Sequence, residues 1–497
     1  MTSTRRFVRL ASALLASSAV FAPAAAWAQT ADTGGGEPLV TDAINVGDWA
    51  LRPSLQLRTR VEGRRNPFDT GGYMPPGAEL TSRTPPTWSQ KVDNQWFVHE
   101  RARVGLAVER GMFRGVFQLQ DARVWGQISP AAADQRDFVP STTAHLAYAE
   151  LRDTGSNPSF LRLGRQEVQW GEGRLIGRSD WSPTGRSLDA ARGVLVVGNF
   201  DFEGFSSILS PPGALPPSVA RTQGSDGTSA EVSRNEGPGA QLHGLRVAWH
   251  VAPLLQLELN ALARFVRQPA PAYLTPSDLY LAGLRVSGKY LAFEYSVEGA
   301  YEMGRVATSR TEAGSSTGSV DDIRAYAGAA RAEVATGLFW KMKIGAQGAY
   351  ASGQKPGDSK VTRFDPILPD INTVHGPMGL YAWSNIIEGA GFFKLTPFRE
   401  SRLLLGYRYL ALARPDDRWQ SSELTYIGSD LKNGSRTLGH EIDFAFGYTP
   451  WAPLTVGVGY GAMLLGDGGK NVLKAMSRDD DTKVQHWGYL QATMTVP

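Results

Sequence analysis

Arginine and aspartate are concentrated in one segment, LRLGRQEVQWGEGRLIGRSDWSPTGRSLDAARG, which occupies residues 161–193. The guanidinium group of arginine is planar and can bind a carboxylate through two parallel hydrogen bonds. A loop of this composition therefore has two possible uses. It binds the carboxylates of a ligand, or its arginines and aspartates pair and hold the loop in place. The charged residues concerned are Arg165, Asp180, Arg186, Asp189 and Arg192.

The same segment contains Gly171 and Gly173, a spacing also found in loops that bind phosphate. A phosphate-binding loop needs the start of a helix directly after it. The Pro and Gly residues that follow oppose a helix, so the sequence does not indicate phosphate binding.

Charged residues elsewhere follow a two-residue period, which places them on one face of a strand. Between residues 51 and 64, mostly apolar residues such as Leu55 and Leu57 alternate with polar and mostly cationic residues such as Arg58, and the pattern recurs to the C-terminus. A cation facing lipid costs roughly 2–4 kcal/mol at mid-membrane, so we expect apolar faces to meet lipid and charged faces to line a water-filled lumen. The predicted lumen charges are Arg52, Arg58, Arg60, Arg101, Arg103, Arg123, Glu294, Glu298, Arg402 and Arg408.

The strands that position these charges alternate between short turns and long loops. The pattern predicts an all-β fold: one closed antiparallel transmembrane β-barrel of about eighteen strands, with short periplasmic turns and long extracellular loops. Predicted short turns include residues 201–203 and 288–289, and residues 62–95, 211–239 and 352–383 are predicted long loops. The predicted strands include residues 160–170 and 338–351.

The first 28 residues are typical of a secretory signal. Arg5, Arg6 and Arg9 precede a short apolar run, and Ala26-Trp27-Ala28 fits a cleavage site. We therefore expect residues 29–497 to form a single domain in the bacterial outer membrane.

Composition excludes several classes of function. The chain has no cysteine, hence no disulfide or thiolate metal site, and its net charge of +3 from 51 basic and 48 acidic residues gives no reason to expect nucleic acid as a partner. The run Asp479–Asp481 with Asp467 could bind calcium, but we interpret it as a solvated loop. The seven histidines show no spacing that indicates a catalytic triad. We predict no enzyme, no cofactor and no metal.

The chain resembles the alginate-export family of outer-membrane barrels. The resemblance rests on the GRQ, GxGRLIG, DW and TGR..DAAR pieces of residues 161–193. It also rests on YASG at 350–353, FDPILPD at 364–370, HGPMG at 375–379, GHEIDFAFGY at 439–448 and VGYGAMLLGD at 458–467. It departs from the family in ending at Pro497, where such barrels usually have an aromatic residue.

The resemblance implies a monomeric barrel that lets an acidic, uronate-containing polysaccharide leave the periplasm, together with periplasmic export partners. A role in guiding the polymer carries over to Arg165, Asp180, Arg186, Asp189 and Arg192, which lie in the matching motif. Two alternatives remain open: a porin for small anionic solutes, and a barrel that anchors an envelope machine. If Arg58 and Arg60 line the conduction path, replacing both with glutamate should shift selectivity toward cations.

Overall fold

The computed structural model describes residues 43–66, 94–125, 141–155, 159–210, 221–223, 229–231, 239–252, 254–266, 276–312, 315–355, 357–370, 372, 374–422, 424, 426–476 and 483–496. The predicted signal segment 1–28, most of the predicted loops 62–95 and 211–239, and the run Asp479–Asp481 lie outside these residues.

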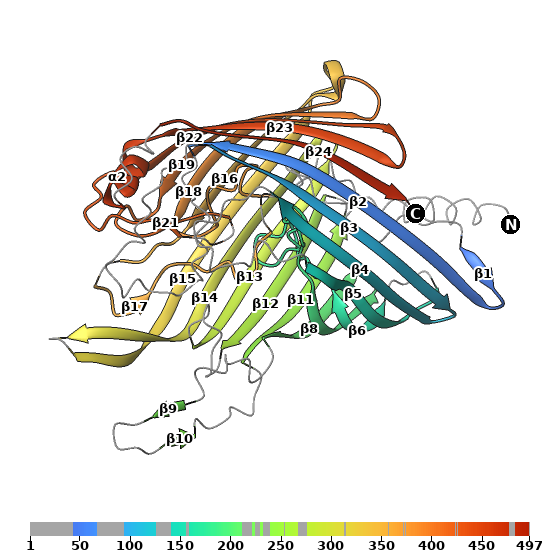
Figure 1. Cartoon of the computed structure of the whole chain (residues 1–497), viewed down its shortest axis with the longest axis horizontal. Helices are drawn as coiled ribbons and strands as arrows, with labels where there is room; N and C mark the ends of the chain where they lie inside the picture. Colours follow the sequence, from blue (N-terminus) through green and yellow to red (C-terminus); the bar gives the residue numbers. More distant parts are fainter. Residues whose placement is uncertain are drawn as a thin grey trace.

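Among the described residues, eighteen strands pair antiparallel in chain order and close into a barrel, because β24 pairs with β2 (Figure 1). The barrel strands are β2 Trp49–Arg65, β3 Asn94–Arg110, β4 Phe113–Trp125, β5 Ser141–Arg152, β6 Phe160–Gln166, β7 Leu188–Val197, β8 Phe200–Ser210, β11 Ala240–Ala252, β12 Leu255–Val266, β13 Ser277–Tyr290, β14 Phe293–Glu312, β15 Ser315–Ala335, β16 Lys343–Ala351, β18 Ile386–Leu395, β19 Ser401–Leu412, β22 Thr437–Trp451, β23 Leu454–Leu465 and β24 Gln485–Val496. The predicted fold class is confirmed.

The chain also forms several shorter elements besides the barrel strands. Strand β1 Ile44–Val46 pairs with the start of β2, and β17 Lys360–Val361 pairs in parallel with β15. Two separate hairpins join β9 Arg221–Gln223 to β10 Ser229–Glu231 and β20 Trp419–Gln420 to β21 Tyr426–Gly428. A 3₁₀ turn, η4, spans Phe339–Lys341, and helix α2 spans Asp467–Ala475.

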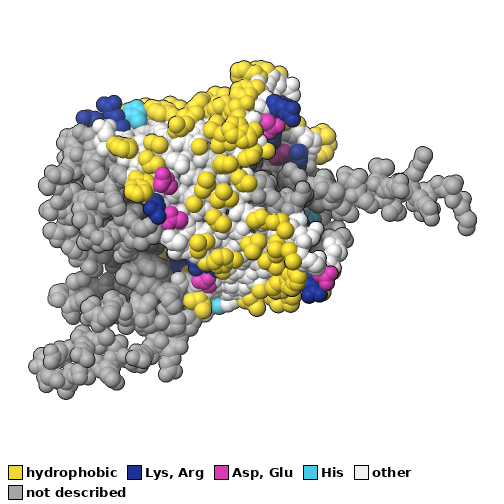
Figure 2. Space-filling view, turned by 45° about the vertical axis from the view of Figure 1, so that its right-hand side comes forward, with side chains coloured by type: hydrophobic (Ala, Val, Ile, Leu, Met, Phe, Trp, Pro, Cys, Tyr) yellow, Lys and Arg dark blue, Asp and Glu magenta, His cyan; other side chains and the backbone are white. Residues whose placement is uncertain are grey.

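The two faces of the strands point as the alternation predicts. In β2, Leu57 and Val61 are 42% and 43% exposed, whereas Arg58 and Arg60 between them are only 2% and 1% exposed. Figure 2 shows hydrophobic side chains spread over the outer wall, with most charged side chains toward its margins. No helix in the described ranges is long and apolar enough to cross a membrane.

Four predicted strand limits are wrong. Residues 201–203 lie within β8, and the chain instead turns at Gly198, whose φ of 61° suits glycine. Residues 288–289 lie within β13, and the turn falls at residues 291–292. The strand predicted at 338–351 begins only at Lys343, because η4 precedes it. The strand predicted at 160–170 ends at Gln166.

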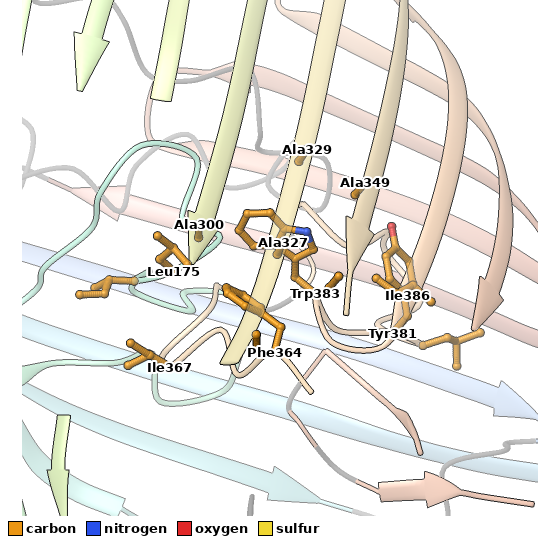
Figure 3. Close-up of a cluster of buried hydrophobic side chains, with 14 of the residues drawn as sticks. Leu175, Ala300, Ala327, Ala329, Ala349, Phe364, Ile367, Tyr381, Trp383 and Ile386 are labelled. Atoms are coloured by element: carbon orange, nitrogen blue, oxygen red, sulfur yellow. The ribbon is translucent and has the colours of Figure 1, made fainter. Parts of the chain in front are cut away.

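The interior differs most from the prediction. Residues 167–187 between β6 and β7 (loop A) and the described residues of 352–385 between β16 and β18 (loop B) fold into the barrel. Leu175 of loop A and Phe364, Ile367 and Trp383 of loop B pack against the alanine-rich inner face of β14–β16 (Figure 3). At this level the predicted water-filled lumen is instead a packed apolar cluster, whose burial stabilises the folded loops.

Candidate functional site

Three arginines of the inner wall surround one carboxylate of loop A. Arg101 of β3 donates from Nη1 to Oδ1 of Asp180 at 2.9 Å and from Nη2 to Oδ2 at 3.3 Å. Arg103 of β3 donates to the same Oδ1 at 3.1 Å, and Nη1 of Arg58 in β2 lies 3.7 Å from Oδ2. All four side chains are at most 5% exposed. We call Arg58, Arg101 and Arg103 the arginine cage.

The register of the sheet explains why this cage forms. Arg58 and Arg101 are direct partners across β2 and β3, and both face inward. Like charges in directly opposite positions repel, so a carboxylate between them is strongly favoured. Gln56 and Gln120 accept hydrogen bonds from Arg101 and Arg103 at 2.8 Å and hold the two guanidinium groups in place.

Loop A is also held through its backbone. Arg58 donates to the carbonyl oxygens of Asp180 at 2.6 Å and Ser182 at 2.8 Å, and Arg60 donates to that of Trp181 at 2.9 Å. The Arg60 guanidinium lies 3.8 Å from the centre of the Trp181 ring, a cation–π contact.

Loops A and B are joined to each other. The amide of Gly177 donates to the carbonyl of Leu368 at 2.9 Å, and the amide of Asp370 donates to that of Gly173 at 2.8 Å. Arg186 donates from Nη1 to carbonyl oxygens of both loops, including that of Leu368 at 2.7 Å. Arg186 is therefore a clamp between the two loops.

Loop B rests on the wall formed by β18, β19 and β22, which β23 and β24 separate from β2, and charges are buried there as well. Arg408 of β19 lies between Glu388, Glu441 and Asp443, with its Nη1 in contact with Asp443. Gly376 of loop B approaches Glu441 so closely that a Cβ there would lie 2.6 Å from Oε1.

His375 precedes this glycine and is fully buried. Burial, together with the nearby guanidinium groups of Arg174 and Arg408, holds the pKa of His375 well below its usual value. The imidazole is therefore neutral at physiological pH, and loop B adds no charge of its own at this position.

A second array of charges lines the inner wall near the short turns. Oε2 of Glu109 lies 3.4 Å from Arg52 and 3.2 Å from Arg152, and Oε1 lies 3.2 Å from Arg114. Glu203 is shared in the same way by Arg192 at 2.8 Å and Arg246 at 3.0 Å.

The array continues around the barrel. Glu333 lies 3.2 Å from Lys343 and 2.7 Å from Lys394. Glu294 lies 2.9 Å from Lys289. Arg246 also lies 3.2 Å from Glu258. The eight cations of this array share five carboxylates, so positive charge exceeds negative charge along this wall. We call the cations of this array the charge belt: Arg52, Arg114, Arg152, Arg192, Arg246, Lys289, Lys343 and Lys394.

The predicted lumen residues fall into separate groups. Arg52, Arg192 and Glu294 lie in or beside the charge belt, and Arg402 is exposed on the inward side of β19 near a short turn. Glu298 is buried on β14, with its Oε2 3.7 Å from Nε of Arg174 in loop A.

Three predicted residues lie on the outer side of the wall instead. Arg123 pairs in register with Glu100 and has the parity of the exposed Phe117 and Leu119. Arg165 and Asp189 are register partners joined by an ion pair at 3.0 Å, and both are well exposed. Their strand parity faces outward, so these residues do not line the lumen.

Sequence reasoning missed several cations of the charge belt and the carboxylates that they share. The cations Arg114, Arg246, Lys343 and Lys394 and the carboxylates Glu109, Glu203 and Glu333 have inward parity in the structure. The two-residue alternation could have identified them. No pattern in the sequence predicts the contact between loops A and B. In the described part of the chain, no group of three or more His, Cys, Asp or Glu side chains is arranged to hold a metal ion.

A closed barrel with an apolar outer wall and a charged interior defines an outer-membrane channel. Solved barrels of Pseudomonas aeruginosa share this fold. OccK9 (OpdG) aligns with a TM-score of 0.51 at 11% identity, covering 90% of this chain and 98% of that one. OccK5 (OpdH) gives 0.51 at 9% identity, also over 90% and 98%.

The family model for alginate export matches residues 87–479. The chain belongs to the alginate export family, and the resemblance predicted from the motifs is confirmed. No protein of curated function matches the chain.

Proposed function

We propose that this barrel is a passive, non-enzymatic channel through which an anionic, uronate-containing polysaccharide leaves the periplasm. The single observation that carries the proposal is the charge belt, where shared carboxylates such as Glu109 and Glu333 leave an excess of cations on the inner wall.

The position of the belt agrees with export. It lies at the end with short turns, which face the periplasm in barrels of this kind. An excess of positive charge in a confined entrance raises the local concentration of a polyanion and guides it inward. Guanidinium groups also recognise carboxylates by geometry as well as charge. We further propose that residues 1–28 are removed on export, that residues 29–497 act as a monomer, and that periplasmic proteins deliver the polymer.

The test is conductance of the purified barrel in planar bilayers, with glucuronate oligomers added on the belt side. We expect these oligomers to interrupt the current, and neutral glucose oligomers of equal length to have little effect. Replacing Lys343 and Lys394 with glutamate should weaken the interruption by roughly tenfold or more, because two cations become two anions.

Arg399→Glu is the matched control. Arg399 lies in a turn at the same end of the barrel, with its side chain 94% exposed. Equal block by charged and neutral oligomers would overturn the proposal. Free passage of small anions without any block by oligomers would instead favour a porin for small solutes.

A further inference from the structure

We infer that the arginine cage is a binding site for a sugar-acid carboxylate and that Asp180 occupies it as an internal stand-in. An incoming carboxylate displaces Asp180, and loop A is then released from the wall. The inference rests on the proposed function for the source of the ligand, but the site itself is defined by the geometry of the cage.

The cage makes with Asp180 the contacts that a bound carboxylate would make. Arg101 approaches both carboxylate oxygens in a bidentate manner, and Arg103 adds a further hydrogen bond to one of them. This fork geometry is how guanidinium groups recognise carboxylates in ligands. A uronate carboxylate has the same shape and charge as the Asp180 side chain, so it can make the same contacts.

Because the cage is positively charged, replacement of Asp180 by another anion is more favourable than a loss of Asp180 that leaves the cage empty. Three guanidinium groups share the Asp180 carboxylate in a space that is almost closed to solvent. Buried cations without a counterion are costly. Asp180 therefore leaves readily only when another anion takes its place.

Loop A is held under backbone strain beside this contact. Ser179, which directly precedes Asp180, has a φ of 49°. A residue other than glycine pays a free-energy cost for this left-handed conformation. On the other side, Gly185 has a φ of 67°, a left-handed conformation that favours glycine, and a Cβ there would lie 2.8 Å from Nη2 of Arg103. The loop relaxes at Ser179 when Asp180 is displaced.

The cage lies on the path from the charge belt. Arg52 of the belt and Arg58 of the cage share the inner face of β2, six residues apart, which corresponds to about 20 Å along a strand. A polymer held at the belt presents many carboxylates to the cage at high local concentration. It can therefore compete with Asp180, which is a single tethered group.

The experiment compares Asp180→Asn with Asp189→Asn in planar bilayers. Asparagine keeps the size of the side chain and removes its charge, and Asp189 is the control because it belongs to the same segment but pairs with Arg165 on the outer side. We expect Asp180→Asn to raise conductance. We also expect it to strengthen binding of glucuronate, added as the monomer and measured as current block, by about tenfold, because the site is no longer occupied.

A second variant separates a binding site from simple loosening of the loop. In Asp180→Asn combined with Arg101→Gln, the conductance stays high but the gain in glucuronate affinity disappears, because the bidentate contact is lost. If the double variant binds glucuronate as tightly as Asp180→Asn does, the inference is wrong. It is also wrong if Asp180→Asn behaves like Asp189→Asn.

Failure of the proposed function gives a different result. In that case glucuronate still binds more tightly to Asp180→Asn, but glucuronate oligomers block no better than neutral oligomers do. The shift in electrophoretic mobility on heating, which distinguishes folded from unfolded barrels, confirms that each variant is folded before its current is measured.

Discussion

At the scale of single residues, the role of an inward-facing arginine depends on whether a folded loop covers it. Arg58 and Arg60 face inward as their alternation predicts, but loop A covers both, and they are 2% and 1% exposed. Arg52 and Arg152 face the same lumen near the short turns and remain 28% and 34% exposed. Only the second pair is accessible to a solute in the folded state, so the first pair acts as anchors for the loop.

This difference changes the expected result of replacing both Arg58 and Arg60 with glutamate. Two new carboxylates would face Asp180, Glu62 and several backbone carbonyl groups, and loop A would be repelled from the wall. We expect a several-fold rise in conductance together with a shift toward cations in planar bilayers. A shift in selectivity at unchanged conductance would show that these arginines face open water.

Replacing Glu109 removes a negative charge beside the charge belt, whereas the previous change adds negative charge to the wall. Glu109→Gln removes the carboxylate shared by Arg52, Arg114 and Arg152 and leaves their charges in place. We expect the preference for chloride over potassium to rise roughly twofold, since one of many charges in a hydrated and screened entrance is lost. The reversal potential across a salt gradient measures this ratio.

Glu400→Gln controls for the change in net charge, since Glu400 is 60% exposed in a turn at the same end of the barrel. An equal shift in both variants would contradict a role for the belt.

At the scale of elements, the junction of loops A and B decides whether the interior stays closed. Gly177 packs directly on Asp370, and a Cβ there would lie 2.4 Å from the Cβ of Asp370 and 2.8 Å from its backbone nitrogen. Because backbone atoms are involved, the neighbour cannot simply rotate away. The two loops can therefore pack together only if residue 177 is glycine.

Gly177→Ala should accordingly separate the loops while the barrel remains intact. We expect a destabilisation of the junction by about 1–3 kcal/mol, the usual cost of overpacking, seen as more frequent channel openings. The transition of the whole barrel on heating should change little. Gly389→Ala is the control, because a Cβ at Gly389 in β18 meets nothing within 4 Å. Similar opening rates in the two variants would refute the role of the junction.

The strands could be predicted from the sequence, but the contact between the loops could not. Alternation is a local signal, and it places Leu57 outside and Arg58 inside without knowledge of the partner strand. The bridge between Ile176 and Leu368 joins residues far apart in the chain and follows no period. The motif at residues 161–193 indicated an Arg–Asp site, but its actual cations, Arg58, Arg101 and Arg103, come from other strands.

Parity alone would have corrected part of the predicted site. Arg123 is among the lumen charges predicted from the alternation. Its odd number places it on the same face of β4 as Phe117 and Leu119, which are 52% and 43% exposed. A charge on that face is tolerated near the end of a strand, where the cost of facing the membrane is small.

At the scale of the whole molecule, apolar side chains face outward and most charged side chains face the interior, the reverse of the arrangement in a soluble protein. Leucines and aromatic residues cover the outer wall, while arginines, glutamates and an apolar cluster of two loops fill the interior (Figures 2 and 3). The apolar outer wall is stable in contact with lipid, and the interior charges are stabilised by ion pairs with one another. Stability in the membrane and closure of the lumen therefore depend on different residues and can be changed separately.

A charge placed on the outer wall tests the first half of this statement. Leu259 is 60% exposed and is the fifth of the twelve residues of β12, whereas Leu151 is 55% exposed but directly precedes the last residue of β5. Leu259→Arg should cost roughly 2–4 kcal/mol of folding free energy in lipid bilayers, and Leu151→Arg only about 0–1 kcal/mol, because the cost falls with distance from the bilayer midplane. Reversible unfolding in denaturant from lipid vesicles measures both. Equal costs at the two sites would mean that β12 does not cross the membrane at the depth that its register with β11 and β13 requires.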